Sequence, residues 1–157
     1  MASFLRPSSK SVVVRRGLLL VTRNRSRRDS EGEWLLLPGG GQHPGEDLHA
    51  TLRREVSEET GITVAPGRLL WIREYIPAHH EFAHFSEQDH AIEFMFEAEV
   101  EGEPAAPTET DPDQIGFEWV APADLAARRF YPRVLIGPIT AFAEGAATGP
   151  VYLGDVN

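Results

Sequence analysis

The stretch that decides the fold runs from Gly40 to Ile62. Residues 40–46 read GGQHPGE and, seven residues later, residues 54–62 read REVSEETGI. The first part is rich in glycine and proline, which predicts a loop. From position 48 onward, apolar residues recur every four positions, at Leu48, Leu52 and Val56. This spacing predicts an amphipathic helix. Gly61 is suited to end that helix in a left-handed conformation.

Three acidic residues of this helix are unusual in their placement. Glu55, Glu58 and Glu59 are three and four residues apart, so they share one side of the helix. Like charges at this spacing cost a few tenths of a kcal/mol per pair, and the helix dipole also disfavours carboxylates in the last turn. A bound divalent cation such as Mg²⁺ removes both penalties. Taken alone, the three glutamates are equally compatible with a solvated acidic face.

The complete pattern resembles the box that defines the Nudix hydrolases, a pattern far more specific than a lone glycine motif. The resemblance implies a loop–helix–loop that holds Mg²⁺ or Mn²⁺ and hydrolyses a diphosphate linkage. It also implies an α/β/α sandwich with a mixed β-sheet between helices. All the defined positions of the box are matched here: Gly40, Glu46, Arg54, Glu55, Val56, Glu58, Glu59, Gly61 and Ile62.

The resemblance assigns roles within the box. The implied metal ligands are carboxylates and one backbone carbonyl: Glu55, Glu58, Glu59 and Gly39. Glu55 is alternatively the base that activates water. Arg54 lies four residues before Glu58 and is expected to orient its carboxylate, with a surface salt bridge as the alternative. Glu46 is expected near the helix start, where it would hold the loop, a water-bound metal or the substrate.

Beyond the box, the candidates for chemistry are weaker. Many members of the family use a further acid from downstream, and the candidates by position are Asp113, Glu118 and Glu93. Each is also compatible with a solvated surface acid. His80 and His84 are four residues apart, but they lie in a predicted loop without a matching ligand set. We therefore expect residues 77–89 to cover the substrate rather than to bind a metal.

Substrate preference rests on a few residues outside the box. Pro77 lies about fifteen residues past the box, as in many family members that act on ADP-ribose. Arginine suits phosphates, and the candidates are Arg23, Arg25 and Arg73. Aromatic rings suit a nucleobase, and those available are Trp34, Tyr75, Phe82 and Tyr131.

These features favour a small nucleoside diphosphate derivative, of the ADP-ribose or nucleotide-sugar type, as the substrate. The alternatives are a nucleoside triphosphate or dinucleoside polyphosphate hydrolase, or a catalytically silent nucleotide-binding domain of the same fold. Silent domains usually lose a box carboxylate, and all are kept here. An isomerase of the isopentenyl diphosphate type shares the fold, but its chemistry relies on a cysteine, and this chain has none.

Composition sets broader bounds. A chain of 157 residues, 41% hydrophobic and 25% charged, fits one globular domain. The net charge of −9 argues against a nucleic-acid partner, although the first 28 residues hold eight basic side chains and no acid. No apolar run is long enough to span a membrane. We expect a cytoplasmic protein, and homodimerisation stays open.

The remaining pattern predicts several strands, with C-terminal helices that would cover them. Residues 1–10 and 146–157 are expected to be loosely ordered, and residues 65–67 to form a turn. A helix over 133–144 is expected to be kinked or broken at Gly137-Pro138. The predicted strands are Val12–Val14, Leu18–Val21, Trp34–Leu37, Leu69–Ile76, Ala91–Val100 and Ile115–Val120, and a short helix is expected from Pro122.

Overall fold

A computed structural model describes residues 4–81 and 90–157 of the chain. Its first half contains β1 (Leu5–Val12), β2 (Val14–Arg15), β3 (Leu18–Asn24), β4 (Trp34–Leu36), β5 (Gly39–Gly41), α1 (Leu48–Thr60) and β6 (Thr63–Tyr75). Its second half contains the 3₁₀ helix η1 (Pro77–His79), β7 (His90–Glu101), β8 (Gln114–Val120), η2 (Pro122–Ala127), β9 (Phe130–Tyr131), η3 (Arg133–Leu135), α2 (Ile136–Ala143) and β10 (Tyr152–Asp155).

The strands form two sheets. One has the order β10-β6-β7-β1-β5, in which β1 runs parallel to β7 and β10 runs parallel to β6. The other sheet is built on β3, which pairs antiparallel with β2, β4 and β8, and β9 extends it beside β4. The predicted mixture of parallel and antiparallel strands is therefore present.

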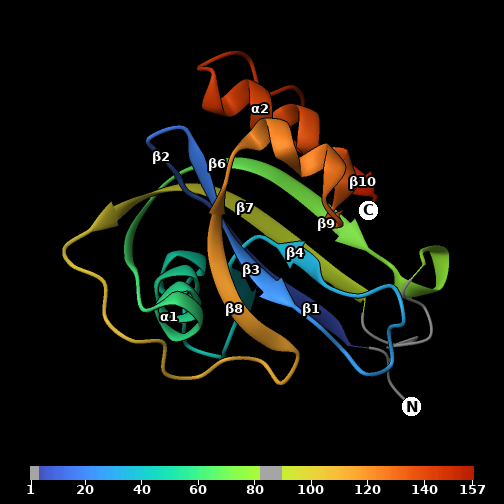
Figure 1. Cartoon of the computed structure of the whole chain (residues 1–157), viewed down its shortest axis with the longest axis horizontal. Helices are drawn as coiled ribbons and strands as arrows, with labels where there is room; N and C mark the ends of the chain where they lie inside the picture. Colours follow the sequence, from blue (N-terminus) through green and yellow to red (C-terminus); the bar gives the residue numbers. More distant parts are fainter. Residues whose placement is uncertain (1–3, 82–89) are drawn as a thin grey trace.

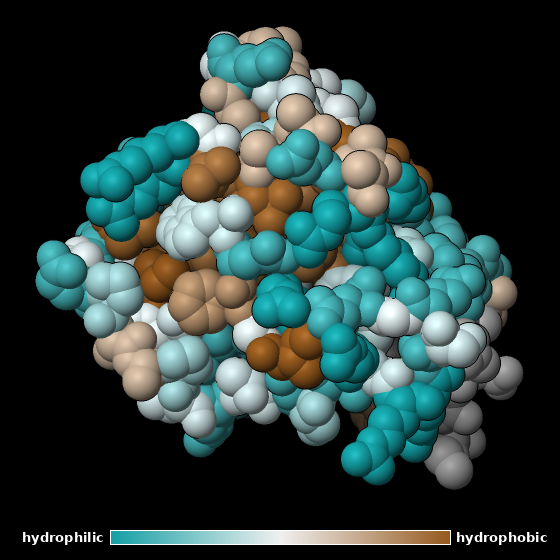
Figure 2. Space-filling view, in the orientation of Figure 1, coloured by the Kyte–Doolittle hydropathy of each residue, from teal (hydrophilic) through white to brown (hydrophobic). Residues whose placement is uncertain are grey.

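The two α-helices cover opposite sides of the strands (Figure 1). Successive residues of a strand point to opposite faces, and the two core clusters divide along this alternation. In β3, Leu19 packs in the cluster that includes Ile139 of α2, whereas Leu20 packs in the cluster that includes Leu52 and Val56 of α1. The predicted α/β/α sandwich is confirmed. On the face shown in Figure 2 the surface is mainly hydrophilic, with apolar residues gathered between the two helices.

Helix α1 begins and ends where its sequence favours. The Asp47 side chain accepts a hydrogen bond from the Ala50 backbone N–H over 2.7 Å, which caps the first turn. Gly61 adopts φ 71° and donates its N–H to the Ser57 carbonyl, the left-handed cap that was predicted. A Cβ at Gly61 would lie 1.8 Å from the Ala105 carbonyl oxygen. Only glycine therefore allows the segment after β7 to pack this closely against the end of α1.

The N-terminal segment differs from the sequence expectation. Residues 1–10 were expected to be loosely ordered, yet Leu5–Val12 form β1 between β7 and β5. Small serines are buried there, and Ser11 donates its hydroxyl to the Pro38 carbonyl. Buried serine carries no hydrophobic periodicity, so the sequence pattern did not reveal this strand.

Three further expectations need correction. Residues 65–67 lie within β6, where a register shift after Pro66 absorbs the predicted turn. The tail expected to be loosely ordered contains β10, which pairs with β6. Helix α2 begins at Ile136, so Pro138 falls in its first turn, where proline needs no N–H partner and neither kinks nor breaks the helix.

Candidate active site

The glycines and glutamates of the box meet where strand β5 lies beside helix α1. The Gly39 N–H donates to Glu59 Oε2 over 2.9 Å in a buried hydrogen bond. A Cβ at Gly40 would lie 2.5 Å from the Glu55 carboxylate, so only glycine allows the carboxylate to lie this close to the backbone. The predicted glycine loop is thus partly an edge strand, because residues 39–41 pair with residues 8–10 of β1.

Arg54 connects the helix to the loop that precedes it. Its Nε and Nη2 donate to the two carboxylate oxygens of Glu46 over 2.6 and 3.0 Å. Its Nη1 donates to Glu55 over 2.8 Å and to Glu58 over 3.3 Å, and Nη2 also reaches the Gly41 carbonyl. The expected contact with Glu58 is present, but the bidentate pair with Glu46 has the shorter contacts.

Glu46 lies at the start of the helix, where the sequence placed it. The hydrogen bond from Arg54 lowers the pKa of Glu46 to about 2, against the opposing effect of burial, and the His43 N–H and Thr51 hydroxyl act in the same direction as Arg54. The carboxylate therefore stays ionised and joins the loop to the first turn of the helix.

Glu59 has the opposite character. It is only 6% exposed, and burial raises its pKa to about 7. The charge of Lys10 and the Gly39 N–H oppose this shift, whereas the charges of Glu55 and Asp111 add to it. No arginine is paired with Glu59 within the described part of the chain. A buried carboxylate without a matching cation favours a positive ligand.

The residues present fit the divalent cation that the resemblance implies. Hard cations prefer carboxylate and carbonyl oxygens, and Glu59, Glu55 and the Gly39 backbone supply both kinds at one place. The charge of Glu55 adds to the cost of ionising Glu59, which a cation would offset. Among residues 4–81 and 90–157, no three acidic or histidine side chains are arranged to hold a metal ion, and Glu55 and Glu58 are instead paired with Arg54.

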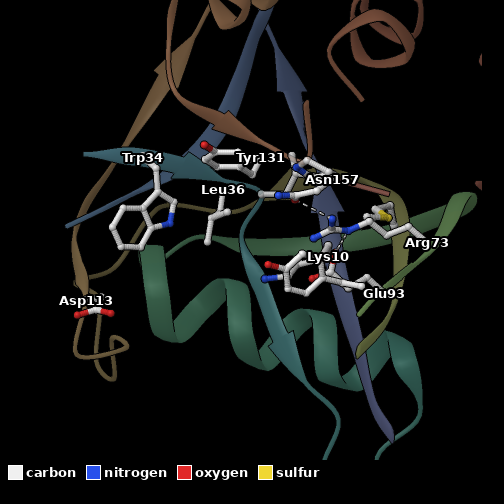
Figure 3. A pocket seen from close by; sticks show the side chains of 12 residues that line it. Lys10, Trp34, Leu36, Arg73, Glu93, Asp113, Tyr131 and Asn157 are labelled. Atoms are coloured by element: carbon white, nitrogen blue, oxygen red, sulfur yellow. Dashed lines mark hydrogen bonds and ion pairs between the residues drawn. The ribbon is translucent and has the colours of Figure 1, made fainter. Parts of the chain in front are cut away.

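The three downstream acids lie in different surroundings. Glu118 pairs with Arg128 on strand β8, and Glu93 pairs with Arg73 over 2.6 Å. Asp113 lies at the edge of a cavity, apart from Lys10 and Glu93 (Figure 3). The acid whose charge acts on Glu59 is instead Asp111, in the segment between β7 and β8. The sequence reasoning missed Asp111, because nothing in the local pattern shows that this segment folds back on α1.

The fold-back of this segment is held by backbone contacts to the end of α1. The Thr108 N–H donates to the Glu58 carbonyl, and the Ala105 N–H donates to the Gly61 carbonyl over 2.7 Å. The Gln114 side chain donates to the Glu59 carbonyl over 2.9 Å. These donors satisfy carbonyls that a helix end leaves unpaired, and they bring the acidic segment to the glutamates.

A cavity of about 290 Å³ opens against the sheet that contains β1, and two of its lining residues, Leu37 and Met95, belong to the core cluster that includes Ile139 of α2. Aromatic and aliphatic side chains form much of its wall, together with a few charged groups (Figure 3). Its lining residues include Lys10, Trp34, Leu36, Arg73, Tyr75, Glu93, Met95, Asp113, Tyr131 and Asn157. An apolar cleft with few polar groups is the usual form of a small-molecule site. Lys10 belongs both to this cavity and to the surroundings of Glu59.

The predicted phosphate-binding arginines fall into two groups. Arg73 lines the cavity, although its guanidinium is paired with Glu93 and with the Val156 carbonyl. Arg23 and Arg25 both pair with Glu33, and neither lines the cavity.

The aromatic and histidine residues singled out in the sequence lie in different parts of the molecule. Trp34, Tyr75 and Tyr131 line the cavity, and the His80 Nε2–H donates to the Asp155 carboxylate over 2.7 Å. Pro77 begins η1. Phe82 and His84, and most of the expected cover over the substrate, lie outside the described residues.

Comparison with known proteins agrees with this geometry. The family model described as NUDIX domain matches residues 5–135. A NUDIX hydrolase from Nitrosomonas europaea has a similar structure, with a TM-score of 0.73 and 20% identity over 90% of each chain. An ADP-ribose pyrophosphatase from Streptococcus suis has a TM-score of 0.62 and 14% identity, over 97% of this chain and 98% of that one. A UDP-X diphosphatase has a TM-score of 0.66 and 15% identity, over 99% of this chain and 69% of that one.

A fold that places α1 beside β5, together with the matched family model, defines a hydrolase of pyrophosphate bonds. The chain belongs to the Nudix family, whose members generally use divalent metal ions. No curated protein sequence matches it closely enough to count as a relative. In the part of the chain that the structure describes, no helix is long and apolar enough to cross a membrane.

Proposed function

We propose that this chain is a divalent-metal-dependent pyrophosphohydrolase that cleaves the diphosphate linkage of a nucleoside diphosphate derivative, of the ADP-ribose or nucleotide-sugar type. The observation that carries the proposal is the buried Glu59 carboxylate, which accepts a hydrogen bond from the Gly39 N–H and is acted on by the charge of Lys10. Lys10 in turn lines a cavity of about 290 Å³. The charged centre suits a cation and a diphosphate, and the adjoining apolar cavity suits the rest of the substrate.

Each box residue has a proposed role. Glu58, Glu59 and the Gly39 carbonyl would hold Mg²⁺ or Mn²⁺, and Glu55 would bind it or accept a proton from the attacking water. When bound, the cation neutralises phosphate charge and lowers the pKa of a bound water. Arg54 holds Glu55 and Glu58 on one side of α1. Asp111 is proposed as the further acid, in place of Asp113, Glu118 and Glu93.

The cavity supports a nucleoside-containing substrate but does not indicate which nucleobase it carries. Trp34, Tyr75 and Tyr131 supply aromatic surface against which a planar ring can pack. The structurally similar proteins include an ADP-ribose pyrophosphatase and a UDP-X diphosphatase, and both names describe nucleoside diphosphate derivatives. A nucleoside triphosphate or a dinucleoside polyphosphate remains the alternative substrate, and a silent binding domain the alternative function.

A substrate panel tests the proposal. Purified protein is assayed with ADP-ribose, nucleotide sugars, dinucleoside polyphosphates and nucleoside triphosphates, with Mg²⁺ and with Mn²⁺, while products are identified by mass spectrometry. We expect the highest kcat/KM for one of the first two classes, and no turnover in excess EDTA. Turnover that survives EDTA would contradict the metal-dependent reaction, and preference for a triphosphate would contradict the substrate class.

A further inference from the structure

Lys10 joins the two halves of the proposed site. It stands in β1 opposite Gly39 of β5, and its Nζ donates to the Gly39 carbonyl over 3.0 Å. The close approach is built into the backbone, because a Cβ at Gly39 would lie 2.1 Å from the Ser9 carbonyl oxygen and 2.8 Å from the Lys10 Cα. The Lys10 side chain also lines the cavity (Figure 3).

Lys10 has no carboxylate as a direct partner. Its charge acts on Glu59 and Glu93, but among the described residues it forms no salt bridge, and its hydrogen bond to Gly39 is to a neutral group. Arg73, the other cation lining the cavity, is paired with Glu93 over 2.6 Å, and Arg54 is paired with Glu46. Lys10 is therefore the cavity cation whose charge is available to an anionic ligand.

The residue type is also informative. Lys10 is the only lysine of the chain, and all the other fourteen positive side chains are arginine. Arginine presents a rigid fork that suits a fixed carboxylate, as at Arg54 and Arg73. Lysine carries a compact charge on a flexible stem, so it can exchange one oxygen partner for another.

We propose that Lys10 is a phosphate-binding residue that turns from the Gly39 carbonyl to a phosphoryl oxygen of the substrate. The reason is that the Gly39 carbonyl is also a proposed ligand of the divalent cation. Two positive groups at one carbonyl oxygen repel each other, so a cation bound there displaces the ammonium group. The displaced group remains beside the cavity, where the diphosphate of the substrate is expected. This inference rests on the proposed function, but its tests do not need turnover.

The single lysine allows a direct test. Selective ¹⁵N labelling of lysine gives one side-chain ammonium resonance, which belongs to Lys10. We expect Mg²⁺ alone to shift this resonance, because the bond to Gly39 is lost. Adding methylenediphosphonate, a diphosphate analogue with a P–C–P bridge that cannot be hydrolysed, should then shift it again. A resonance that does not respond to the diphosphonate would overturn the proposal.

Variants of Lys10 give a second test, because the affinities for two ligands are expected to change in opposite directions. Lys10→Met removes the charge but keeps an unbranched side chain. It should bind Mn²⁺ about threefold to tenfold more tightly, since a like charge is removed from the Gly39 carbonyl. It should bind methylenediphosphonate with Mg²⁺ about tenfold more weakly, because a charged hydrogen bond is lost. Lys10→Arg keeps the charge and should retain diphosphonate affinity within about threefold.

The matched control is Arg68→Met, which removes one exposed charge from β6 away from the cavity. Both affinities are measured by calorimetry at about pH 8.5. At this pH Glu59, with a pKa of about 7, is mainly ionised in the unaltered chain. The charge of Lys10 lowers that pKa, so the Mn²⁺ titration of Lys10→Met is repeated at about pH 8, where an equal affinity would show that Glu59 is ionised in this variant as well. Mn²⁺ affinity that falls in Lys10→Met, or diphosphonate affinity equal to that of Arg68→Met, would show that Lys10 only supports the backbone. Absence of hydrolysis across the substrate panel would refute the proposed function instead, and these binding results would still decide the role of Lys10.

Discussion

Glu93 on β7, whose side chain is 13% exposed, and the buried Glu59 on α1 are two carboxylates with very different surroundings. Burial disfavours the ionised form of both. At Glu93 the charges of Arg73 and Lys10 outweigh burial and lower the pKa, whereas at Glu59 burial dominates and raises the pKa to about 7. Arg73 lies 2.6 Å from Glu93, whereas the hydrogen bond to Glu59 comes from a neutral backbone N–H.

By this difference, Glu93 belongs to a structural ion pair, whereas Glu59 lacks a directly paired positive group. A paired buried charge mainly fixes local geometry, because its removal leaves its partner unpaired. An unpaired buried carboxylate lowers the stability of the free protein and gains from a bound cation. The comparison predicts that substitutions at Glu59 alter activity, whereas substitutions at the Glu93 pair alter folding.

The largest expected effect is on catalysis. Glu59→Gln keeps the shape of the side chain and removes its charge, so kcat should fall by about a thousandfold or more. Metal-free protein should unfold at the same or a higher temperature, because an unfavourable buried charge is lost. Steady-state kinetics and thermal unfolding with and without Mg²⁺ measure both effects. Lower stability with retained activity would assign Glu59 to the structure and not to the site.

The next effect is on folding. Arg73→Met leaves the largely buried Glu93 without its partner. Because Glu93 is partly exposed, the free energy of unfolding should fall by somewhat less than the roughly 3–5 kcal/mol expected for a fully buried pair. The double variant Arg73→Met/Glu93→Gln removes both charges and should recover much of this loss. Urea unfolding monitored by circular dichroism measures the difference. A single variant as stable as the double variant would show that the pair is effectively solvated.

Stability should also depend on pH through Glu59. Its pKa is about 7 in the folded chain and near 4.5 in the unfolded chain, so the folded state holds the proton more tightly between these values. In EDTA, the unfolding free energy contributed by this group should therefore fall as pH rises from about 5 to 8, by at most about 3 kcal/mol. Glu59→Gln is the control and should lack this component. An unchanged pH profile in that variant would contradict the raised pKa.

Divalent-metal affinity should follow the opposite trend, because a protonated carboxylate must lose its proton before it binds a cation. Mn²⁺ titrations at about pH 6 and pH 8 should show tighter binding at the higher pH. Affinity that does not change over this interval would indicate that the Glu59 carboxylate is not a metal ligand.

The smallest expected effect concerns the arginines before the box. Arg23 and Arg25 share Glu33 and lie outside the cavity lining, so Arg23→Ala should change KM by less than about twofold. The sequence-based hypothesis predicts a larger rise in KM than fall in kcat. Steady-state kinetics of Arg23→Ala and Arg25→Ala distinguish these outcomes, and a severalfold rise in KM would restore them as phosphate ligands.

Local sequence determined much of the helix and the nature of its site. The Leu48, Leu52 and Val56 repeat set the buried face of α1, and Gly61 set its end. The acids at positions 55, 58 and 59 indicated a cation before any contact was known. These features depend on residues within one or two helical turns, where spacing along the chain fixes spacing in space.

Contacts between distant segments were decided by the tertiary structure alone. Only folding shows that Glu59 is buried against Gly39 and that Asp111 acts on it, because both effects depend on segments far apart in the sequence. Strand β1 is likewise held by its neighbours β5 and β7, and this pairing brings Lys10 to Gly39. The sequence by itself determined which residues carry the charge, and the tertiary structure decided which of those charges are paired, because burial and pairing depend on what packs against each group.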